Sequence, residues 1–166
     1  IRSRAGLSRP CLTIDKDVDL YKAIKSYSNA LAAQFESLRW VIIDECQFLT
    51  EEQVDQLSDV VDFLDINVMC YGLRTDFKSR LFPASKRLFE LADDIEEVKS
   101  TCECGKNKTS INARFDKNGD IIVDGDQIMV GGDESYRAIC RKCWKDKVRD
   151  KINKEMERKG RNEATD

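Results

Sequence analysis

The chain has 166 residues, of which 41% are apolar, and a net charge of −3 with acidic and basic residues interspersed. This length suits one ordinary domain, or one domain with a small appendage, and the apolar fraction suffices for a core. No apolar run approaches the roughly 20 residues that cross a bilayer, and the N-terminus has no signal-peptide pattern. No global basic field favours nucleic acid, so we expect a soluble cytoplasmic protein with a small-molecule partner.

A strand that ends in two carboxylates follows a predicted loop (residues 1–13) and a predicted helix (residues 16–38). Trp40-Val-Ile-Ile runs directly into Asp44 and Glu45, and such an apolar run is typical of a parallel strand covered on both faces. Ligands gather at the carboxyl ends of these strands. Because neighbours on a strand point to opposite faces, one carboxylate could hold Mg²⁺ while the other reaches a substrate hydroxyl, as on a Walker B strand. A strand that ends in two solvated acids is the alternative.

The next segment predicts a strand–helix–strand unit. Thr50-Glu-Glu-Gln53 is a capping box, and it opens a helix that extends to about Leu64. A second apolar strand, Ile66 to Tyr71, stops at Gly72. The two strands of such a unit are expected to be parallel, with a right-handed crossover.

Residues 73–83 are too polar for a core yet contain two phenylalanines. They predict an active-site loop, although both phenylalanines could equally be packing anchors. A short helix from about Ala84 to Leu91 is expected to follow. Residues 94–101 predict a further strand, with Ile95 and Val98 as its apolar anchors.

From residue 101 onward the pattern predicts short strands and turns. Lys108 to Phe115 alternates, residues 116–120 form a hairpin turn that contains Gly119, and Ile121 begins the return strand. Residues 136–140 predict another strand, and a helix starts near Arg141. The pattern therefore predicts three segments: an α/β segment (1–100), a β-rich segment (101–150), and a charged tail without assigned function (151–166).

Four of the seven cysteines form two close pairs, and the chain has no histidine. Cys102-Glu-Cys104 and Cys140-Arg-Lys-Cys143 predict a tetrahedral, structural zinc site. A redox pair or buried free thiols are the alternatives. Cys11, Cys46 and Cys70 are expected to be plain apolar residues.

Four motifs together resemble the type II thymidine kinases, especially the bacterial branch. They are Asp44-Glu-Cys-Gln-Phe48, Tyr71-Gly-Leu-Arg-Thr-Asp-Phe77, the two cysteine pairs, and Gly131-Gly-Asp-Glu-Ser-Tyr136-Arg-Ala-Ile-Cys140. The resemblance covers essentially residues 2–148. It implies an α/β fold with a P-loop, RecA-like parallel sheet that has helices on both faces, plus a small β-rich zinc domain that carries a lasso loop. Residues 1–100 would then be a partial P-loop nucleotide-binding domain, without the first strand and the P-loop, and residues 101–150 the zinc-ribbon and lasso domain that binds thymidine.

The resemblance also implies roles for individual residues. Glu45 would be the catalytic base, Asp44 would hold Mg²⁺, and Gln47 would contact the nucleotide. Cys102, Cys104, Cys140 and Cys143 would be the zinc ligands. The residues that it assigns to thymidine, partly through backbone groups of the lasso, are Phe48, Leu73, Phe77, Gln127, Ile128, Met129, Val130, Gly131 and Tyr136.

The implied activity is ATP-dependent phosphorylation of the 5′-hydroxyl of thymidine, and of deoxyuridine, by a homotetramer that thymidine triphosphate inhibits. The sequence contains no Gly-rich loop ending in Gly-Lys-Ser/Thr, so we expect about fifty upstream residues to carry it, and expect residues 1–166 alone to be inactive. Two alternatives are a RecA- or helicase-like ATPase and a zinc-ribbon binding module on an α/β scaffold.

Overall fold

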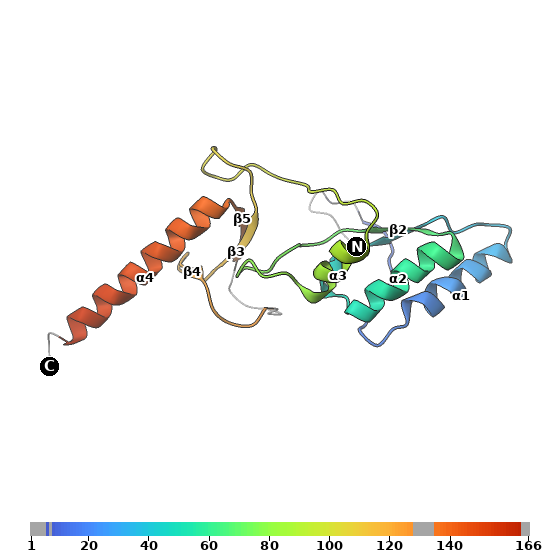
Figure 1. Cartoon of the computed structure of the whole chain (residues 1–166), viewed down its shortest axis with the longest axis horizontal. Helices are drawn as coiled ribbons and strands as arrows, with labels where there is room; N and C mark the ends of the chain where they lie inside the picture. The colour runs from blue at the N-terminus through green and yellow to red at the C-terminus, as the bar shows by residue number, and fades with distance from the viewer. Residues whose placement is uncertain (1–5, 7, 128–134, 164–166) are drawn as a thin grey trace. The chain divides into compact units, whose positions relative to one another are not determined.

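The computed structural model describes residue 6, residues 8–127 and residues 135–163, with side chains through residue 157. The chain divides into two compact units, Ile1–Gly72 and Leu73–Asp166 (Figure 1). The predicted zinc segment, residues 101–150, lies within the second unit. The predicted boundaries at residues 100 and 150 remain predictions.

The first unit is a mixed helix and parallel-strand fold. Its elements are α1 (Leu20–Ala32), β1 (Trp40–Ile43), the short 3₁₀ helix η1 (Cys46–Phe48), α2 (Glu51–Leu64) and β2 (Asn67–Cys70). The strands β1 and β2 are parallel, with Trp40 opposite Asn67 and Ile43 opposite Cys70. The helices α1 and α2 lie side by side, and α2 packs against β2 (Figure 1). The predicted strand–helix–strand unit is confirmed.

Gln53 explains why α2 begins where it does. The Thr50 hydroxyl accepts a hydrogen bond from the Gln53 backbone N–H (3.1 Å), and the Gln53 amide oxygen accepts one from the Thr50 N–H (3.1 Å). This capping box is the predicted one. The amide nitrogen of Gln53, which is 2% exposed, also donates to the carbonyls of Asp15 (2.9 Å) and Val18 (3.1 Å). One side chain therefore caps α2 and fixes the segment that leads into α1.

The small parallel sheet is covered on one face only in the part of the chain that the structure describes. Ile43 is buried, as are Val54 and Leu57 of α2, the helix that packs against the neighbouring strand β2. Trp40 and Ile42, which precede Ile43 on β1, are 53% and 66% exposed. The prediction of a strand covered on both faces therefore does not hold for these residues, because no described helix lies over the side of Trp40 and Ile42.

The second unit contains α3 (Pro83–Leu91) and an antiparallel sheet of β3 (Ile111–Phe115), β4 (Ile121–Ile122) and β5 (Ser135–Ile139), in the order β4-β3-β5. The predicted hairpin turn is present: Asp116 accepts hydrogen bonds from the N–H groups of Asn118 and Asp120 (both 2.9 Å), and Gly119 adopts φ +80°. Gly119 is suited to this left-handed position because it has no Cβ.

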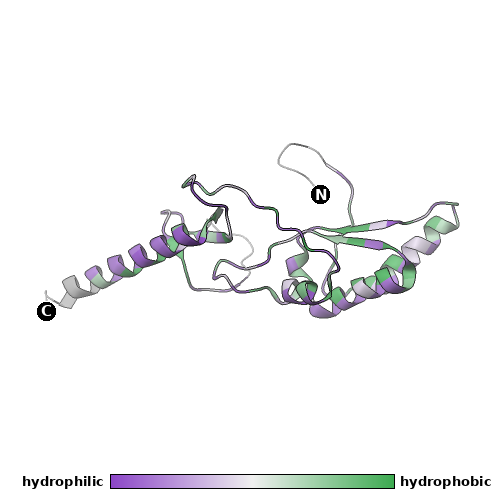
Figure 2. Cartoon of the chain, turned by 45° about the horizontal axis from the view of Figure 1, so that its top comes forward, coloured by the Kyte–Doolittle hydropathy of each residue, from purple (hydrophilic) through white to green (hydrophobic). Residues whose placement is uncertain are grey.

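The helix α4 (Arg141–Glu163) closes the second unit and packs on β3 and β4. The Lys151 ammonium donates to the Ile121 carbonyl (2.9 Å), and Lys154 pairs with Asp120 (3.2 Å). Most of α4 is hydrophilic (Figure 2), so only its first turns contribute to the core. None of the helices among the described residues has the length and apolarity that a membrane crossing requires.

One predicted strand is wrong. Residues 94–100 form no helix or strand, and only Thr101 makes an isolated bridge, to Lys108. Ile95 and Val98, the expected anchors, are 58% and 88% exposed. Two apolar residues in a stretch of acidic and basic neighbours bury too little surface to offset the cost of ordering an additional strand.

Candidate functional site

The carboxyl end of β1 carries a tight acidic turn. Asp44 and Glu45 are both exposed, and an Asp44 side-chain oxygen accepts a hydrogen bond from the Glu45 N–H (3.0 Å). Glu45 has φ 54° and ψ 38°, in the left-handed region, which is uncommon outside glycine and is found more often at functional sites. This turn points the chain away from the strand, so both carboxylates project at its end.

The buried side chain of Gln47 contacts the Glu45 carboxylate. Gln47 is 2% exposed, and its amide nitrogen donates a hydrogen bond to Glu45 Oε2. The Cys46 N–H donates to the carbonyl of Tyr71 (2.9 Å), which joins the turn to the end of β2. The structure thus brings together Asp44, Glu45 and Gln47, the three predicted catalytic and nucleotide-contacting residues.

Gly72 is required by this arrangement. A Cβ at position 72 would lie 2.5 Å from Gln47 Oε1 and 2.6 Å from the Cys46 sulfur. Any larger residue would therefore displace the side chain that holds Glu45. A glycine suits position 72, two residues after β2, because the turn that follows β1 occupies the space that a side chain would need.

The thiols of Cys46 and Cys70 interact beneath the same turn. A hydrogen bond with Cys70 lowers the pKa of Cys46, and the same contact together with burial raises the pKa of Cys70. Cys46 is buried and Cys70 half-buried, in keeping with their prediction as apolar residues, whereas Cys11 is exposed. An exposed Cys11 is a difference from the predicted packing role.

The predicted nucleoside contacts are distributed over both units. Phe48 lies in the first unit and is 44% exposed; in the second, Leu73 is 39% and Tyr136 is 45% exposed. Phe77 is 1% exposed, with the Arg114 guanidinium carbon 4.8 Å from its ring centroid. Gln127 donates to Asp76 Oδ2 (3.0 Å). The predicted contacts at residues 128–131 (Ile128, Met129, Val130 and Gly131) lie outside the described residues.

Two buried charged residues were missed by the sequence analysis. Asp76 is 4% and Arg114 is 1% exposed. Asp76 follows Thr75 in a polar loop, and an aspartate at such a position was the available signal, since Asp side chains accept backbone N–H groups within turns. Arg114 sits in an alternating strand and was indistinguishable from an outward-facing residue.

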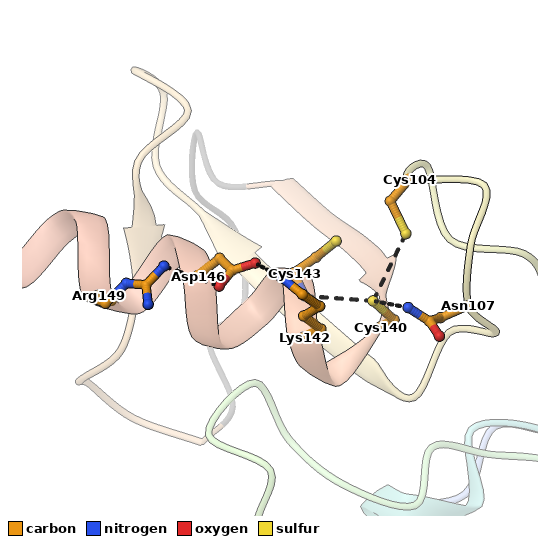
Figure 3. Close-up of polar contacts among 7 residues, drawn as sticks. All are labelled: Cys104, Asn107, Cys140, Lys142, Cys143, Asp146 and Arg149. Atoms are coloured by element: carbon orange, nitrogen blue, oxygen red, sulfur yellow. Dashed lines mark hydrogen bonds and ion pairs between the residues drawn. The ribbon is translucent and has the colours of Figure 1, made fainter.

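The four predicted metal ligands meet at one place. The sulfur atoms of Cys102, Cys104, Cys140 and Cys143 all lie within 4.8 Å of one another, and those of Cys104 and Cys140 are 4.0 Å apart (Figure 3). A tetrahedron with Zn–S distances of about 2.3 Å has S···S edges of about 3.8 Å. The cluster therefore fits zinc with little adjustment. Four thiolates leave no open position, so a zinc ion here would be structural.

Backbone and side-chain donors already favour thiolates at this cluster. Hydrogen bonds led by the Lys106 N–H lower the pKa of Cys104 to about 6. The Cys143 N–H, 3.4 Å from the Cys140 sulfur, lowers the pKa of Cys140, and Asn107 also donates to that sulfur (3.7 Å; Figure 3). Interaction with the Cys140 thiol raises the pKa of Cys143 to about 12. In the metal-free cluster, Cys104 and Cys140 therefore lose their protons at lower pH than Cys143.

The core of the second unit is built around these ligands. Cys102 and Cys140 are 3% exposed and pack with Ile111, Ala113 and Phe115 of β3. A zinc ion would therefore fix both the ends of the β segment and the start of α4.

An open depression of about 760 Å³ lies beside the cluster, and Lys108 and Arg141 are among the residues that line it. None of the predicted thymidine contacts that the structure describes lines this depression.

These features define an α/β protein with an acidic parallel-strand end and a separate four-cysteine metal-type site. A family model described as thymidine kinase matches residues 8–144. The chain is 45% identical over 148 residues to a thymidine kinase of Mannheimia succiniciproducens, covering 89% of this chain and 73% of the relative. It is 45% identical over 146 residues to one of Aliivibrio fischeri (88% and 73% covered), and 44% identical over 144 residues to one of Agrobacterium fabrum (87% and 72% covered). The chain belongs to the thymidine kinase family, as the resemblance predicted.

Proposed function

We propose that this protein transfers the γ-phosphate of ATP to the 5′-hydroxyl of thymidine, and of deoxyuridine, and so supplies the monophosphate for nucleotide salvage and DNA synthesis. Membership of the thymidine kinase family supports the reaction. The observation within the structure that supports it most directly is the turn at the end of β1, where the Asp44 carboxylate accepts the Glu45 N–H and Gln47 bonds the Glu45 carboxylate.

Glu45 is the proposed catalytic base. Phosphoryl transfer needs mainly positioning and charge neutralisation, with one residue that orients and deprotonates the attacking hydroxyl. The Glu45 carboxylate is exposed to an incoming hydroxyl, and a buried amide bonds one of its oxygens. That bond restricts the rotation of the carboxylate and leaves its other oxygen to accept the proton of the 5′-hydroxyl.

Asp44 is the proposed ligand of the Mg²⁺ that accompanies ATP, directly or through water, and Gln47 belongs to the same nucleotide-contacting segment. A carboxylate oxygen is the kind of ligand that Mg²⁺ prefers, and Mg²⁺ neutralises the charge that develops on the phosphates. The parallel β1–α2–β2 unit is compatible with a P-loop, RecA-like sheet with helices on both faces, and we include that architecture in the proposal.

For the nucleoside we propose a site on the second unit that includes Leu73, Phe77 and Tyr136, with backbone groups of residues 127–131 that recognise the base. Phe48 of the first unit is also proposed as a thymidine contact. The proposed structural zinc ion anchors the β segment that carries this loop. Backbone groups that pair with a buried base reject analogues that leave them unpaired, and exclusion of water suppresses the competing hydrolysis of ATP.

The remaining parts of the proposal concern the assembly. We propose a cytoplasmic homotetramer that thymidine triphosphate inhibits, as the resemblance implies. A reducing compartment keeps cysteines available as zinc thiolates, which agrees with the four-cysteine cluster.

Substitution of Glu45 tests the proposed chemistry. Because a general base contributes about 10²–10⁴-fold, Glu45→Gln should lower kcat for thymidine phosphorylation at least about a hundredfold, with the Kd for thymidine within about twofold. Glu52→Gln, at an exposed acidic residue in the first turn of α2, is the matched control and should keep kcat. A Glu45→Gln protein with more than about a tenth of the original kcat would rule out the assigned base.

A second substitution tests the nucleoside site. Tyr136→Ala should weaken thymidine binding, measured by calorimetry, whereas Tyr27→Ala, at a comparably exposed tyrosine on α1 (52%), should not. Normal thymidine affinity in Tyr136→Ala would remove Tyr136 from the site and favour the zinc-ribbon alternative for the second unit.

A further inference from the structure

Asp76 organises the turn that carries Phe77. Its Oδ1 accepts hydrogen bonds from the N–H groups of Lys78 (2.8 Å) and Arg80 (2.9 Å), and its own N–H donates to the Arg80 carbonyl (2.9 Å). The turn closes with a bridge between Thr75 and Leu81. An aspartate that accepts N–H groups two and four residues ahead fixes the path of a loop without any secondary structure.

The second oxygen of Asp76 points to a different segment. Asp76 Oδ2 accepts the bond from the Gln127 amide (3.0 Å), 51 residues further along the chain. One carboxylate, 4% exposed, therefore joins the Phe77 turn to the segment at Gln127, and all its described bonds run to neutral donors. A buried hydrogen bond to a charged group is among the stronger kinds.

Arg114 of β3 forms a parallel connection. Its guanidinium stacks on the Phe77 ring and donates to the carbonyl of Asp126 (3.1 Å). Tyr136 of β5 is paired with Arg114 across the sheet. Three residues that the proposed function assigns to the nucleoside, Phe77, Gln127 and Tyr136, thus lie beside Asp76 or Arg114, neither of which the resemblance singled out.

We propose that Asp76 is a positioning residue for nucleoside binding: it holds the Gln127 segment and the Phe77 turn together, and Arg114 stabilises the same arrangement. This inference rests on the proposed function. Asp76 touches no substrate in this account, so its substitution should change the Kd and KM for thymidine while kcat is retained.

Two substitutions that exchange the amide and the carboxylate test the connection between Asp76 and Gln127. Gln127→Glu places a second carboxylate against Asp76 Oδ2, and we expect the Kd for thymidine to rise at least about tenfold. In the double variant Gln127→Glu/Asp76→Asn, the side-chain oxygen at position 76 still accepts the two backbone N–H groups. The new amide nitrogen at position 76 now donates to the carboxylate introduced at position 127. The double variant should recover most of the lost affinity.

A matched double variant separates this pairing from a general effect of negative charge. Gln127→Glu/Asp124→Asn removes one negative charge at a residue of the same segment that lies outside this hydrogen-bonded pair, and its affinity should stay as low as that of Gln127→Glu. Should Gln127→Glu fail to fold, Gln127→Ala replaces it. Asp76→Asn should then add little to its loss of affinity, whereas independent roles would make the two losses additive.

Thymidine calorimetry on the unmodified protein comes first, so that the two failures can be told apart. Without thymidine binding, the proposed function fails and this inference fails with it. If the unmodified protein binds thymidine but Asp76→Asn does not rescue Gln127→Glu, only this inference is overturned, and Gln127 acts on the nucleoside directly. A kcat that falls in parallel with affinity in Asp76→Asn would likewise contradict a positioning role.

Discussion

Gly72→Ala should destabilise the first unit and disturb Glu45 together. The added Cβ would lie 2.5 Å from Gln47 Oε1 and 2.6 Å from the Cys46 sulfur, whereas ordinary contacts are 3.4–4 Å. Overpacking of this kind costs about 1–3 kcal/mol. Gln47 can move aside only by giving up its bond to the Glu45 carboxylate, a charged hydrogen bond worth about 1.5–3 kcal/mol. These two costs are alternatives, because movement of Gln47 relieves the overpacking, so we expect a loss of about 1–3 kcal/mol in the free energy of unfolding.

The two tryptophans allow this loss to be measured in one unit. Trp40 lies on β1, and Trp144 lies on α4 in the second unit. The Trp144 indole N–H is buried without a hydrogen-bond partner among the described residues, so Trp144→Phe breaks no hydrogen bond there, and the packing that it changes is that of the second unit's core. In that background, urea unfolding followed by Trp40 fluorescence reports on the first unit.

A double variant identifies the source of the strain. Cys46→Ala removes one of the two close contacts, so Gly72→Ala should cost less in that background, with a coupling of about 0.5–3 kcal/mol. Ser37→Ala, at an exposed residue before β1, is the control and should shift stability by no more than about 0.5 kcal/mol. An unchanged urea midpoint in Gly72→Ala would refute the close packing of Gly72 against the Glu45 turn.

Three further predictions concern the cap and the cysteines. Thr50→Ala removes the hydroxyl that accepts the Gln53 N–H and should cost about 1 kcal/mol by urea unfolding; an effect below a few tenths would contradict the cap. Cys140→Ser should lower zinc affinity, measured by chelator competition, by more than the roughly 10–100-fold that a supporting residue contributes, and unimpaired binding would exclude the cluster. In the metal-free protein at pH 7, Cys104, with a pKa of about 6, is a thiolate and Cys143, with a pKa of about 12, is protonated, so mass spectrometry should find Cys104 alkylated before Cys143; equal rates for these two thiols would contradict those shifts.

Features that depend on neighbouring residues were predictable from the sequence. The cap at Thr50 and the turn at Gly119 are each determined by side chains within four residues, and both are confirmed. The paired cysteines predicted a four-thiolate cluster because two cysteines close in sequence can bind the same metal ion, so that two such pairs complete a tetrahedral site. The structure brings all four together. The strand predicted at residues 94–101 failed because two apolar residues do not reveal whether a partner strand exists.

The parts that escaped prediction depend on contacts between distant segments. Arg114 is buried because the Phe77 turn packs over it, and nothing in the alternation of β3 distinguishes it from a solvent-facing residue. Asp76 gains its importance from Gln127, 51 residues away. The need for glycine at position 72 arises from Gln47 and Cys46 in the turn that follows another strand. Sequence patterns give the period of a segment but not the identity of its tertiary neighbours.

Transfer of labelled γ-phosphate from ATP to thymidine, by the protein as its gene encodes it, tests the central claim most directly. We predict thymidine 5′-monophosphate as the product, formation that depends on Mg²⁺, and loss of that product in Glu45→Gln while thymidine is still bound. A folded, zinc-loaded protein that binds ATP and thymidine yet forms no thymidine monophosphate, or a Glu45→Gln variant that forms it at the original rate, would contradict the account.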